Sequence, residues 1–572
     1  MQTIKKLIAE DVASSAAKLF AGAELSAEEL AGMFEYPPDA NMGDLALPCF
    51  KLSRTLRRAP VQIASALADA LTKGEGSPVA SCEAVNGYLN IKISEEYLAD
   101  SVLTEILEKK EKYGAPRGLE GKKIVLDYSS PNVAKPFHIG HLGTTVIGHA
   151  LKKLYEFGGA DCVGINHLGD WGTQFGKMIV AYRKWGDPEK VAKGGCDGLV
   201  DLYVKFHEEA EKDPTLNDEA RAEFTKLEHR DEENLRLWRL FLDISLKEYD
   251  TTYKQLGIEF DSYNGESFYT DKMPEQVERL KASGLLKLDD GASLVDLSEY
   301  GMPPCLILKR DGSTLYPTRD IAAAYYRKNT YNFDKCIYVT SAGQSLHFAQ
   351  WFKVVELMGY DWADKLVHVP YGTVSINGAK LATRTGNVIL LKDLFAQAIE
   401  KVKDIMKEKS PDLENMDEAA EAVGVGAIVF YYLSGNRIRD INFIMEDALS
   451  FDGNTGPYVQ YTYARTCSVL AKAGERTNAA SKLTSPEEKE LLKTLCRFRE
   501  NTEAAIADSE PFYITRFILE VATAYNRFYH NCRILSEENA EIRETRIRLT
   551  EATNAVLGRA FELICLKKLS KI

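Results

Sequence analysis

Three basic side chains lie close together in the sequence, directly after a short apolar run. Lys135, His138 and His141 follow KIVLDY at residues 123–128, and the next residues, TVIGHALKKLYEFGG, have a helical pattern. A strand, a tight turn and a helix in this order form nucleotide sites in doubly wound folds, because the helix N-terminus offers unpaired N–H groups to a phosphate. His138 and His141 are three residues apart, so both can reach the same triphosphate, and Lys135 adds a mobile cation. Gly140 leaves room for a base or ribose close to the backbone.

The alternative interpretation of this segment is an ordinary strand-to-helix junction with two surface histidines. The apolar strand before it and the polar neighbours Asn132 and Lys135 favour the nucleotide site. The elements that would position these residues therefore decide between the two interpretations.

Strand and helix patterns alternate over residues 114–398. The strand candidates are KIVLDY, DCVGINHL, CIYVTS and VHVPYGTVSI, which predict a largely parallel sheet covered on both faces. Charged helical segments over residues 184–258 interrupt the alternation and indicate an insertion. An apolar stripe within them predicts core packing, and its members are Leu235, Trp238, Leu242 and Leu246.

A smaller unit, residues 1–113, precedes the alternating region. It contains a helix that Pro60 could open and Gly74 could close, followed by the strand GYLNIKIS. Alternation gives this strand an apolar face of Leu89, Ile91 and Ile93 and a polar face of Tyr88, Asn90 and Lys92. The polar face could stack on a base and touch phosphate, or it could be a solvated strand face.

The last region, residues 399–572, is almost wholly helical. Amphipathic segments cover 419–433, 459–473, 486–507 and 511–535, and a last helix begins near Thr545, which predicts a helical bundle. We therefore expect an α/β multidomain protein with a Rossmann-like parallel-sheet catalytic domain carrying insertions. A small N-terminal α+β domain and a C-terminal all-α bundle complete it.

The bulk composition is that of an ordinary globular protein. The chain has 572 residues, with 45% hydrophobic and 27% charged residues, and no apolar run long enough to span a membrane. The ten cysteines include no CxxC and no zinc-like spacing, and the N-terminal segment has acidic residues unlike a signal peptide. We expect a cytoplasmic enzyme with no protein-held metal. The net charge of −13 cautions against a nucleic-acid partner, although a local basic stripe would suffice for one.

Five motifs in order resemble those of arginyl-tRNA synthetases, which are class I aminoacyl-tRNA synthetases. They are SSPNVAKPFHIGHL, NHLGDWGTQFG, YPTRDIAAAYYR, AGQSLHF and SFDGNTGPYVQYTYAR, and the resemblance covers nearly the whole chain. It implies an arginine–tRNA ligase that activates L-arginine with ATP, releases pyrophosphate, and transfers arginine to the 3′ end of tRNA(Arg), releasing AMP. Mg²⁺ would arrive with ATP, held mainly by phosphates and water. The alternatives are another enzyme with a HIGH motif and a non-enzymatic RNA-binding paralogue.

The resemblance also assigns an arginine pocket. A guanidinium prefers a planar anionic partner, and Tyr316 and Asp320 lie four residues apart at a helix start, so they could supply a hydroxyl and a carboxylate together. Glu266 would be a second acid there. The family positions for the amino and carboxylate end of the substrate match Ser130, Asn132 and Gln344, with Asp127 beside the amino group. Asp320 could instead form a salt bridge with Arg319 or Arg327, or cap a helix.

A second nucleotide signature is expected in NGAKLATRTGNV, residues 377–388. Lys380 matches the first lysine of the KMSKS motif, and Thr383 and Arg384 would complete the ATP contacts. The second lysine is missing, and the resemblance implies that Lys135 takes its role. The alternative is an ordinary hairpin loop. Two further departures from the family pattern are Gly143, where arginine is common, and the C-terminal LICLKKLSKI.

RNA contacts follow from the resemblance by location. The helical domain would bind the anticodon, with Tyr458, Tyr461 and Arg465 on one helical face, although these three could equally be bundle core. Tyr88 and Asn90 match the strand that reads the D-loop at the outer corner of the tRNA. We expect a monomer.

Overall fold

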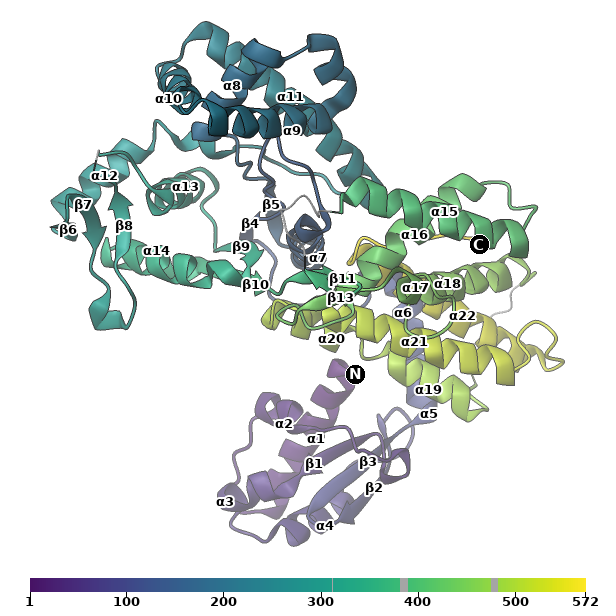
Figure 1. The fold of residues 1–572 in the computed structure, drawn as a ribbon. Helices are drawn as coiled ribbons and strands as arrows, with labels where there is room; N and C mark the ends of the chain where they lie inside the picture. Colours follow the sequence, from purple (N-terminus) through teal and green to yellow (C-terminus); the bar gives the residue numbers. More distant parts are fainter. Residues whose placement is uncertain (311, 381–388, 475–481) are drawn as a thin grey trace.

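The computed structural model describes residues 1–310, 312–380, 389–474 and 482–572. A small N-terminal unit lies against a C-terminal helical bundle, and the bundle adjoins a central sheet with helical additions on two sides (Figure 1). In the described part of the chain, no helix combines the length and apolar character needed to cross a membrane.

Four parallel strands form the central sheet, in the order β10-β9-β4-β5. They are β4 (Lys123–Asp127), β5 (Asp161–Ile165), β9 (Lys335–Ser341) and β10 (Leu366–Tyr371). The parallel sheet predicted from the sequence is therefore confirmed. The last predicted strand is divided, because Gly372 turns the chain close against the Arg439 carbonyl, where an added Cβ would collide. The second part becomes β11 (Val374–Ile376), which pairs with β12 (Ala379–Lys380) and β13 (Ile441–Phe443).

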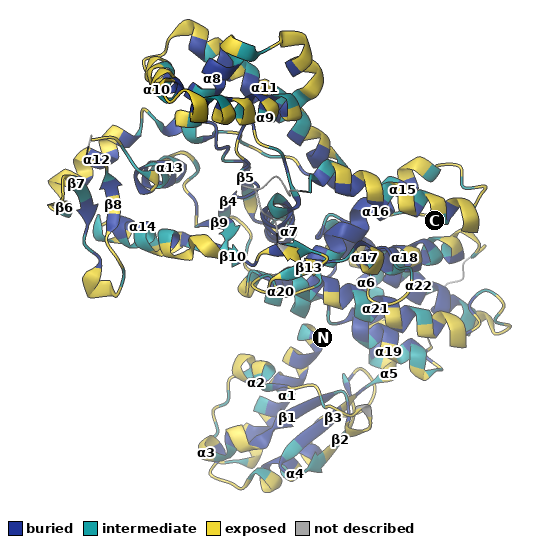
Figure 2. Cartoon of the chain, in the orientation of Figure 1, coloured by how far each residue is buried: buried dark blue, intermediate teal, exposed yellow. Residues whose placement is uncertain are grey.

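Helices cover both faces of the sheet, as the nearly continuous apolar strands predict. Helix α7 (Leu142–Phe157) packs on the face that presents Leu126 and Ile337, and it is buried along almost its whole length (Figure 2). Helices α13 (Tyr316–Tyr331) and α14 (Ser345–Leu357) pack on the opposite face with Val125 and Tyr338. Beside them lie α12 (Met273–Ala282) and an antiparallel sheet of β6 (Leu286–Asp289), β7 (Ala292–Val295) and β8 (Cys305–Leu308).

The insertion is a helical unit with its own core. It comprises α8 (Thr173–Trp185), α9 (Pro188–Lys212), α10 (Thr215–Glu228) and α11 (Glu232–Leu256). Its apolar cluster contains Phe175, Phe206 and Phe241, and the predicted stripe from Leu235 to Leu246 packs into the same cluster. The prediction of core packing is confirmed, although the helical unit begins before residue 184.

The bundle confirms the predicted helical pattern, but several helix bounds differ from the prediction. Its helices are α15 (Leu391–Lys409), α16 (Met416–Leu433), α17 (Met445–Ala448), α18 (Gly456–Ala471), α19 (Pro486–Leu495), α20 (Phe498–Ala507), α21 (Phe512–Asn531) and α22 (Ala540–Glu562). The single helix predicted over 486–507 is wrong, because the chain breaks near Cys496, whose carbonyl accepts a hydrogen bond from the Met1 amino group. The last helix begins earlier than Thr545, because the Asn539 side chain caps the N–H groups of the next turn. Helix α15 runs across the predicted boundary between residues 398 and 399.

The N-terminal unit packs helices on a three-stranded antiparallel sheet. It contains α1 (Gln2–Leu19), α2 (Ala27–Met33), β1 (Leu45–Pro48), α3 (Ser53–Leu56), α4 (Pro60–Ala70), β2 (Val79–Val85) and β3 (Tyr88–Ile93), and α5 (Glu95–Tyr97) and α6 (Leu103–Lys109) lead to the sheet domain. Helix α4 ends at Ala70, before the predicted Gly74. The apolar face of β3 is confirmed, but Asn90 on the polar face of this central strand is only 7% exposed.

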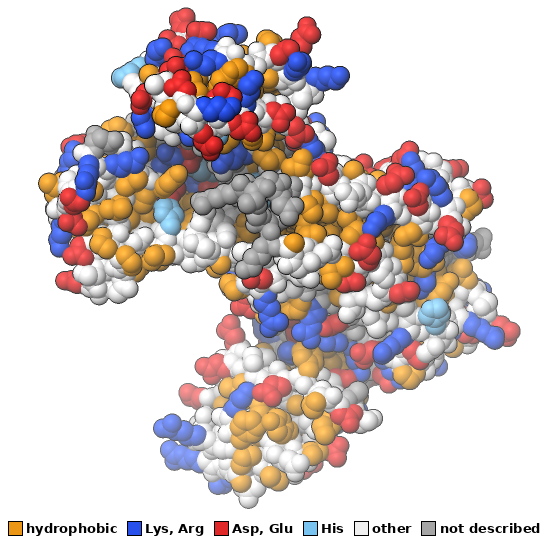
Figure 3. Space-filling model, viewed as in Figure 1, with side chains coloured by type: hydrophobic (Ala, Val, Ile, Leu, Met, Phe, Trp, Pro, Cys, Tyr) orange, Lys and Arg blue, Asp and Glu red, His pale blue; other side chains and the backbone are white. Residues whose placement is uncertain are grey.

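Ion pairs connect the N-terminal unit to the bundle. Figure 3 shows Lys and Arg side chains gathered at this junction. Lys489 pairs with Glu95 at 2.6 Å, and Lys493 pairs with Asp44 at 2.5 Å. The two units that flank the sheet domain in sequence are therefore neighbours in space.

Candidate active site

The loop that follows β4 has an uncommon backbone. Ser129, Ser130 and Ala134 have φ values of 70°, 48° and 59°, in the left-handed region that residues with a Cβ rarely adopt. Such residues persist only where surrounding contacts fix them. Ser130 donates its hydroxyl to Asp127 Oδ1 at 2.9 Å and its N–H to Asn166 Oδ1 at 3.1 Å. The loop is thus held at the carboxyl ends of two adjacent strands, where open α/β sheets bind ligands.

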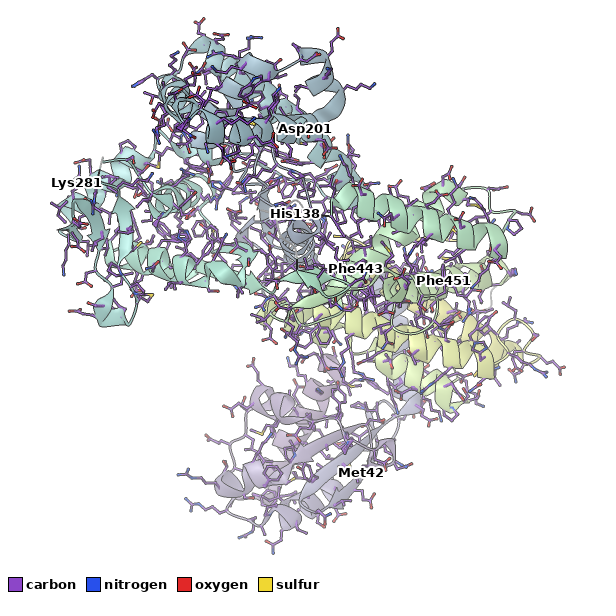
Figure 4. All side chains as sticks on the ribbon, viewed as in Figure 1. Met42, His138, Asp201, Lys281, Phe443 and Phe451 are labelled. Carbon is purple, nitrogen blue, oxygen red and sulfur yellow. The ribbon has the colours of Figure 1, made fainter. Side chains whose placement is uncertain are left out.

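The two predicted histidines form one compact turn at the start of α7. Figure 4 places His138 at the centre of the molecule, between the insertion and the bundle. His138 Nδ1 accepts the Gly140 N–H at 3.0 Å, and His141 Nδ1 accepts the His138 N–H at 3.2 Å. The two ring centroids are 3.9 Å apart, and His141 also stacks on Phe137 at 5.2 Å. Because each Nδ1 accepts a backbone proton, the proton of each neutral ring lies on Nε2, where it can be donated to a ligand.

Burial keeps both imidazoles uncharged near neutral pH. It lowers the pKa of His141 to about 3, with the nearby His138 and Lys135 acting in the same direction, and it lowers the pKa of His138. The positive charge comes from Lys135, which is exposed.

Three acids occupy the predicted arginine end, each beside a different basic side chain. Asp127 Oδ2 lies 2.8 Å from Arg327 Nη2, and Glu266 Oε2 lies 2.5 Å from Arg319 Nη1. Asp320 Oδ2 lies 2.6 Å from His347 Nε2. The alternative pairing of Asp320 with Arg319 or Arg327 does not occur, because both arginines bind other acids.

The three pairs differ in how free the acid remains. Asp127 accepts from Ser130 on one oxygen and pairs with the fully buried Arg327 on the other, so both of its oxygens help to hold the loop in place. Burial, with Asp320 and Asp170 nearby, raises the pKa of Glu266 to about 7, and Arg319 opposes this rise. Asp320 has one oxygen outside its bond to His347.

The remaining predicted pocket residues are open to solvent. Tyr316 is 66% exposed at the first turn of α13, with the Arg319 guanidinium 5.6 Å from its ring centroid. Gln344, just before α14, and Asn132 in the loop are also exposed. An added Cβ on Gly169 would collide with the Asn132 side-chain oxygen, so this glycine gives Asn132 its place.

The second nucleotide signature is described only at its edges. Lys380 ends β12, and Thr383 and Arg384 lie outside the described residues. Downstream, Leu391 N–H donates to the Phe137 carbonyl at 2.9 Å, and Leu390 forms an antiparallel bridge with His138. The residues that follow this segment are thus bonded directly to the histidine turn.

Family models match three parts of the chain. Residues 102–445 match the catalytic domain of class I (R) tRNA synthetases, residues 459–572 the DALR anticodon binding domain, and residues 2–93 the arginyl tRNA synthetase N-terminal domain. An arginine–tRNA ligase from Clostridioides difficile is 50% identical over 95% of this chain and 96% of its own. One from Clostridium botulinum is 49% identical over 98% of both chains.

The chain belongs to the arginyl-tRNA synthetase family.

Solved structures agree with this family at the level of the fold. The arginyl-tRNA synthetase of Thermus thermophilus has a TM-score of 0.80 at 23% identity. Its alignment covers 98% of this chain and 99% of the Thermus chain. The arginyl-tRNA synthetase of Plasmodium falciparum has a TM-score of 0.79 at 25% identity. Its alignment covers 100% of this chain and 98% of the Plasmodium chain. The family assignment confirms the predicted arginine–tRNA ligase over the alternatives of another enzyme with a HIGH motif or a binding paralogue.

Gly143 is explained by its neighbours. It lies in the first turn of α7, and an added Cβ would collide with the Tyr432 hydroxyl of α16 and the ring of Tyr371. Two tyrosines therefore fill the space in which a longer side chain would lie. The C-terminal segment also packs inward, since Leu566 is buried against α16 and Gln460 donates to the Lys567 carbonyl at 3.1 Å.

The predicted RNA-contact residues divide between surface and interior. Tyr461 is 45% exposed, and Arg465 lies between its ring and that of Tyr529, with centroid distances of 5.1 and 4.8 Å. These three residues line a cavity of about 550 Å³. Tyr458 is half-buried and accepts a hydrogen bond from Asn526 at 2.9 Å, so it belongs to the support of this surface.

In the N-terminal unit, Tyr88 is half-buried with its ring edge against Phe50, at 5.4 Å between centroids. Tyr88 is thus more exposed than Asn90, which is buried.

Sequence reasoning missed the partners of the pocket acids. Arg327 lies within YPTRDIAAAYYR and His347 within AGQSLHF, so both residues were present in the motifs. Arg327 was considered only as a partner of Asp320, and its pairing with Asp127 depends on how α13 crosses the sheet.

Proposed function

We propose that the chain catalyses adenylation of L-arginine at the loop and histidine turn described above, followed by transfer to tRNA(Arg). The observation that carries the proposal is that two imidazoles, each with its Nδ1 accepting a backbone proton, and the cation of Lys135 meet at one helix start. Two acids suited to a guanidinium, Glu266 and Asp320, lie in a short helical turn at residues 266–269 and near the start of α13.

In the first step an oxygen of the arginine carboxylate attacks the α-phosphorus of ATP. A carboxylate–phosphorus bond forms, and the bond from that phosphorus to the bridging oxygen of the β-phosphate breaks, releasing pyrophosphate. In the second step a ribose hydroxyl at the tRNA 3′ end attacks the acyl carbon, loses its proton, and AMP departs. Neither step needs a protein nucleophile, so positioning and charge stabilisation are the protein's contribution.

His138 and His141 are assigned to the phosphates. Their Nε2–H groups would donate to oxygens that gain negative charge as the phosphorus becomes pentacoordinate, and burial preserves them as neutral donors. Lys135, with Lys380, Thr383 and Arg384, would complete the ATP contacts, and Gly140 would admit the nucleoside. Mg²⁺ would enter with ATP, with phosphate and water oxygens as its main ligands, since the described residues hold no group of three or more candidate metal ligands.

Asp320 and Tyr316 are assigned to the guanidinium, with Glu266 as the second acid. Asp320 is favoured as the principal partner, because His347 occupies only one of its oxygens and histidine is a weaker competitor than a permanent cation. Ser130, Asn132 and Gln344 would bind the amino and carboxylate groups, with Asp127 acting through the loop.

For tRNA(Arg) we propose two contact surfaces. Tyr461 and Arg465 would face the anticodon, with Tyr458 supporting them from within the bundle. Tyr88 would face the D-loop, with the buried Asn90 supporting the same strand. The division into domains at 1–113, 114–398 and 399–572 belongs to the same proposal, as does action as a monomer in the cytoplasm. The ten free cysteines are consistent with a reducing compartment.

The test is ATP–pyrophosphate exchange across a panel of amino acids, with and without total tRNA. We expect exchange with arginine and with no other amino acid of the panel. Comparing exchange with and without tRNA shows whether activation needs bound tRNA. Exchange with a different amino acid would overturn the pocket assignment while leaving the histidine turn intact. An absence of exchange under every condition would contradict the proposal as a whole.

A further inference from the structure

Helix α11 of the insertion presents three hydroxyl groups on one face. Ser245, Tyr249 and Tyr253 are four residues apart, so successive residues lie about one helical turn from each other. Their side chains are buried, at 0%, 0% and 1% exposure. The predicted apolar stripe on the same helix gives no account of a buried row of hydroxyls.

All three hydroxyls bond to the loop that carries the proposed substrate contacts. Ser245 Oγ accepts the Ala134 N–H at 3.0 Å. Tyr249 Oη lies 2.8 Å from the carbonyl of Asn132 and 2.8 Å from that of Lys135, and donates its single proton between them.

The third hydroxyl reaches the start of the same loop. Tyr253 Oη lies 2.7 Å from Ser129 Oγ, and it accepts from Asn166 Nδ2 at 3.0 Å. Asn166 in turn receives the Ser130 N–H, so the contact extends to the next residue of the loop.

These contacts fall on the strained part of the backbone. The left-handed residues Ser129 and Ala134 are bonded directly, and Ala134 belongs to the apolar core of the insertion. A strained backbone needs contacts on several sides to persist, and α11 supplies them from one rigid element.

The same two tyrosines also reach the histidine turn. The Phe137 ring lies 5.4 Å from that of Tyr249 and 5.6 Å from that of Tyr253, and on its other side it stacks on His141. One helix therefore contacts the supports of both Lys135 and His141.

Helix α11 is fixed on a further side as well. Glu248, next to Tyr249, accepts the Cys196 N–H at 3.1 Å and lies 3.5 Å from Lys392 Nζ. Lys392 also pairs with Asp197 at 2.7 Å.

We propose that α11 is the positioning element for adenylation, and that Tyr249 is its principal positioning residue. By holding the carbonyls of Asn132 and Lys135 with one hydroxyl, Tyr249 fixes the loop so that both side chains point to the reacting groups. This inference rests on the proposed adenylation function and assigns to the insertion a part in the chemistry.

The experiment is the substitution Tyr249→Phe, which removes one oxygen and keeps the ring packed on Phe137. The matched control is Tyr155→Phe, a buried tyrosine on the far part of α7 whose hydroxyl accepts a hydrogen bond from Lys335 at 3.2 Å. For both variants, kcat and KM of arginine-dependent ATP–pyrophosphate exchange and the thermal midpoint are measured on the full chain with tRNA present.

Tyr249→Phe is expected to lower kcat of exchange about 10- to 100-fold, the range for a displacement of about 1 Å at reacting groups. Its KM for ATP and its thermal midpoint should stay close to those of the wild type. Tyr253→Phe should show a smaller loss in the same direction, and Tyr155→Phe should exchange like the wild type.

Wild-type exchange by Tyr249→Phe would overturn the positioning role, as would an equal loss in Tyr155→Phe or a loss that follows the thermal midpoint. Failure of the wild type itself to exchange with any amino acid would overturn the proposed function and the positioning role together, so the two failures are distinguishable.

Discussion

The proposed nucleotide end and the proposed arginine end of the site differ in how their side chains carry charge. At the proposed nucleotide end, His138 and His141 are half-buried rings whose Nδ1 atoms accept backbone protons, and desolvation keeps both rings neutral by lowering their pKa. At the arginine end, three acids keep basic partners at 2.5–2.8 Å. A neutral donor can stabilise charge that appears only during reaction, whereas a fixed anion binds a ligand that is charged from the start. The difference suggests that the first end sets rate and the second sets specificity.

The largest expected effect is at the arginine end. Asp320→Asn keeps the shape of the side chain but removes its charge, so the guanidinium would meet a site without its anionic partner. We expect kcat/KM for arginine to fall about 10³-fold, since removing one partner of a hydrogen-bonded charge pair costs about 2–5 kcal/mol, with the KM for ATP nearly unchanged. Exchange kinetics measure both constants.

The control for this variant is Asp161→Asn, which removes an exposed carboxylate paired with Lys123 at the start of β5. It should exchange like the wild type. Unchanged arginine kinetics in Asp320→Asn would contradict the assignment of the pocket.

At the nucleotide end we expect a somewhat smaller effect. His141→Ala removes one prearranged donor and should slow adenylate formation about 10²- to 10³-fold, the range for a lost oxyanion donor. Affinity for tRNA, measured by filter binding, should change little, because the proposed anticodon and D-loop contacts lie on other surfaces. Comparable losses in both measurements would indicate a histidine that only maintains the fold.

The two ends should also differ in their response to pH. The pKa of His141 is about 3, so this ring stays neutral from pH 5 to 8, and its contribution should not vary there. The pKa of Glu266 is raised to about 7, so this acid gains its charge as pH rises through 7. If Glu266 assists the guanidinium, the KM for arginine should be about tenfold lower at pH 8 than at pH 6, from the change in ionised fraction.

The matching variant is Glu266→Gln, which should flatten this pH profile of the arginine KM. Stability should respond with the opposite sign. A carboxyl group with a raised pKa in the folded state stabilises that state most at low pH, and this contribution is lost as pH rises from about 4.5 to about 7. A profile that is equally steep in the wild type and in Glu266→Gln would exclude Glu266 as its cause.

Local order in the sequence made one part of the site predictable. The strand, turn and helix that carry Lys135, His138 and His141 are consecutive, and the parallel sheet follows from its apolar runs. The pairings at the arginine end depend on crossing angles between distant elements, as with Asp127 and Arg327. The hydroxyls of Tyr249 and Tyr253 lie more than 100 residues from the loop they hold, and no periodicity in the sequence reports that contact.

The same distinction explains the errors in the bundle and in the N-terminal unit. The break near Cys496 involves a hydrogen bond from the Met1 amino group, at the other end of the chain. Asn90 is buried because its strand, β3, lies between β1 and β2. The Asn539 cap, by contrast, is a local signal that could have been found from the sequence.

The smallest expected effect tests where the bundle meets the nucleotide end. In Gly143→Ala, the added Cβ would meet the Tyr432 hydroxyl and the Tyr371 ring, which is overpacking in a buried region. We expect a loss of about 1–3 kcal/mol in stability, seen as a lower thermal midpoint, because buried neighbours can shift only partly. Tyr432→Phe in the same chain removes the colliding oxygen and should restore part of that loss. If it restores nothing, the tyrosine does not account for the glycine. If the rate of exchange falls in Gly143→Ala while the thermal midpoint is unchanged, the contact between the bundle and α7 acts on the histidine turn itself. The rate of adenylation then depends on how the bundle packs against the start of α7.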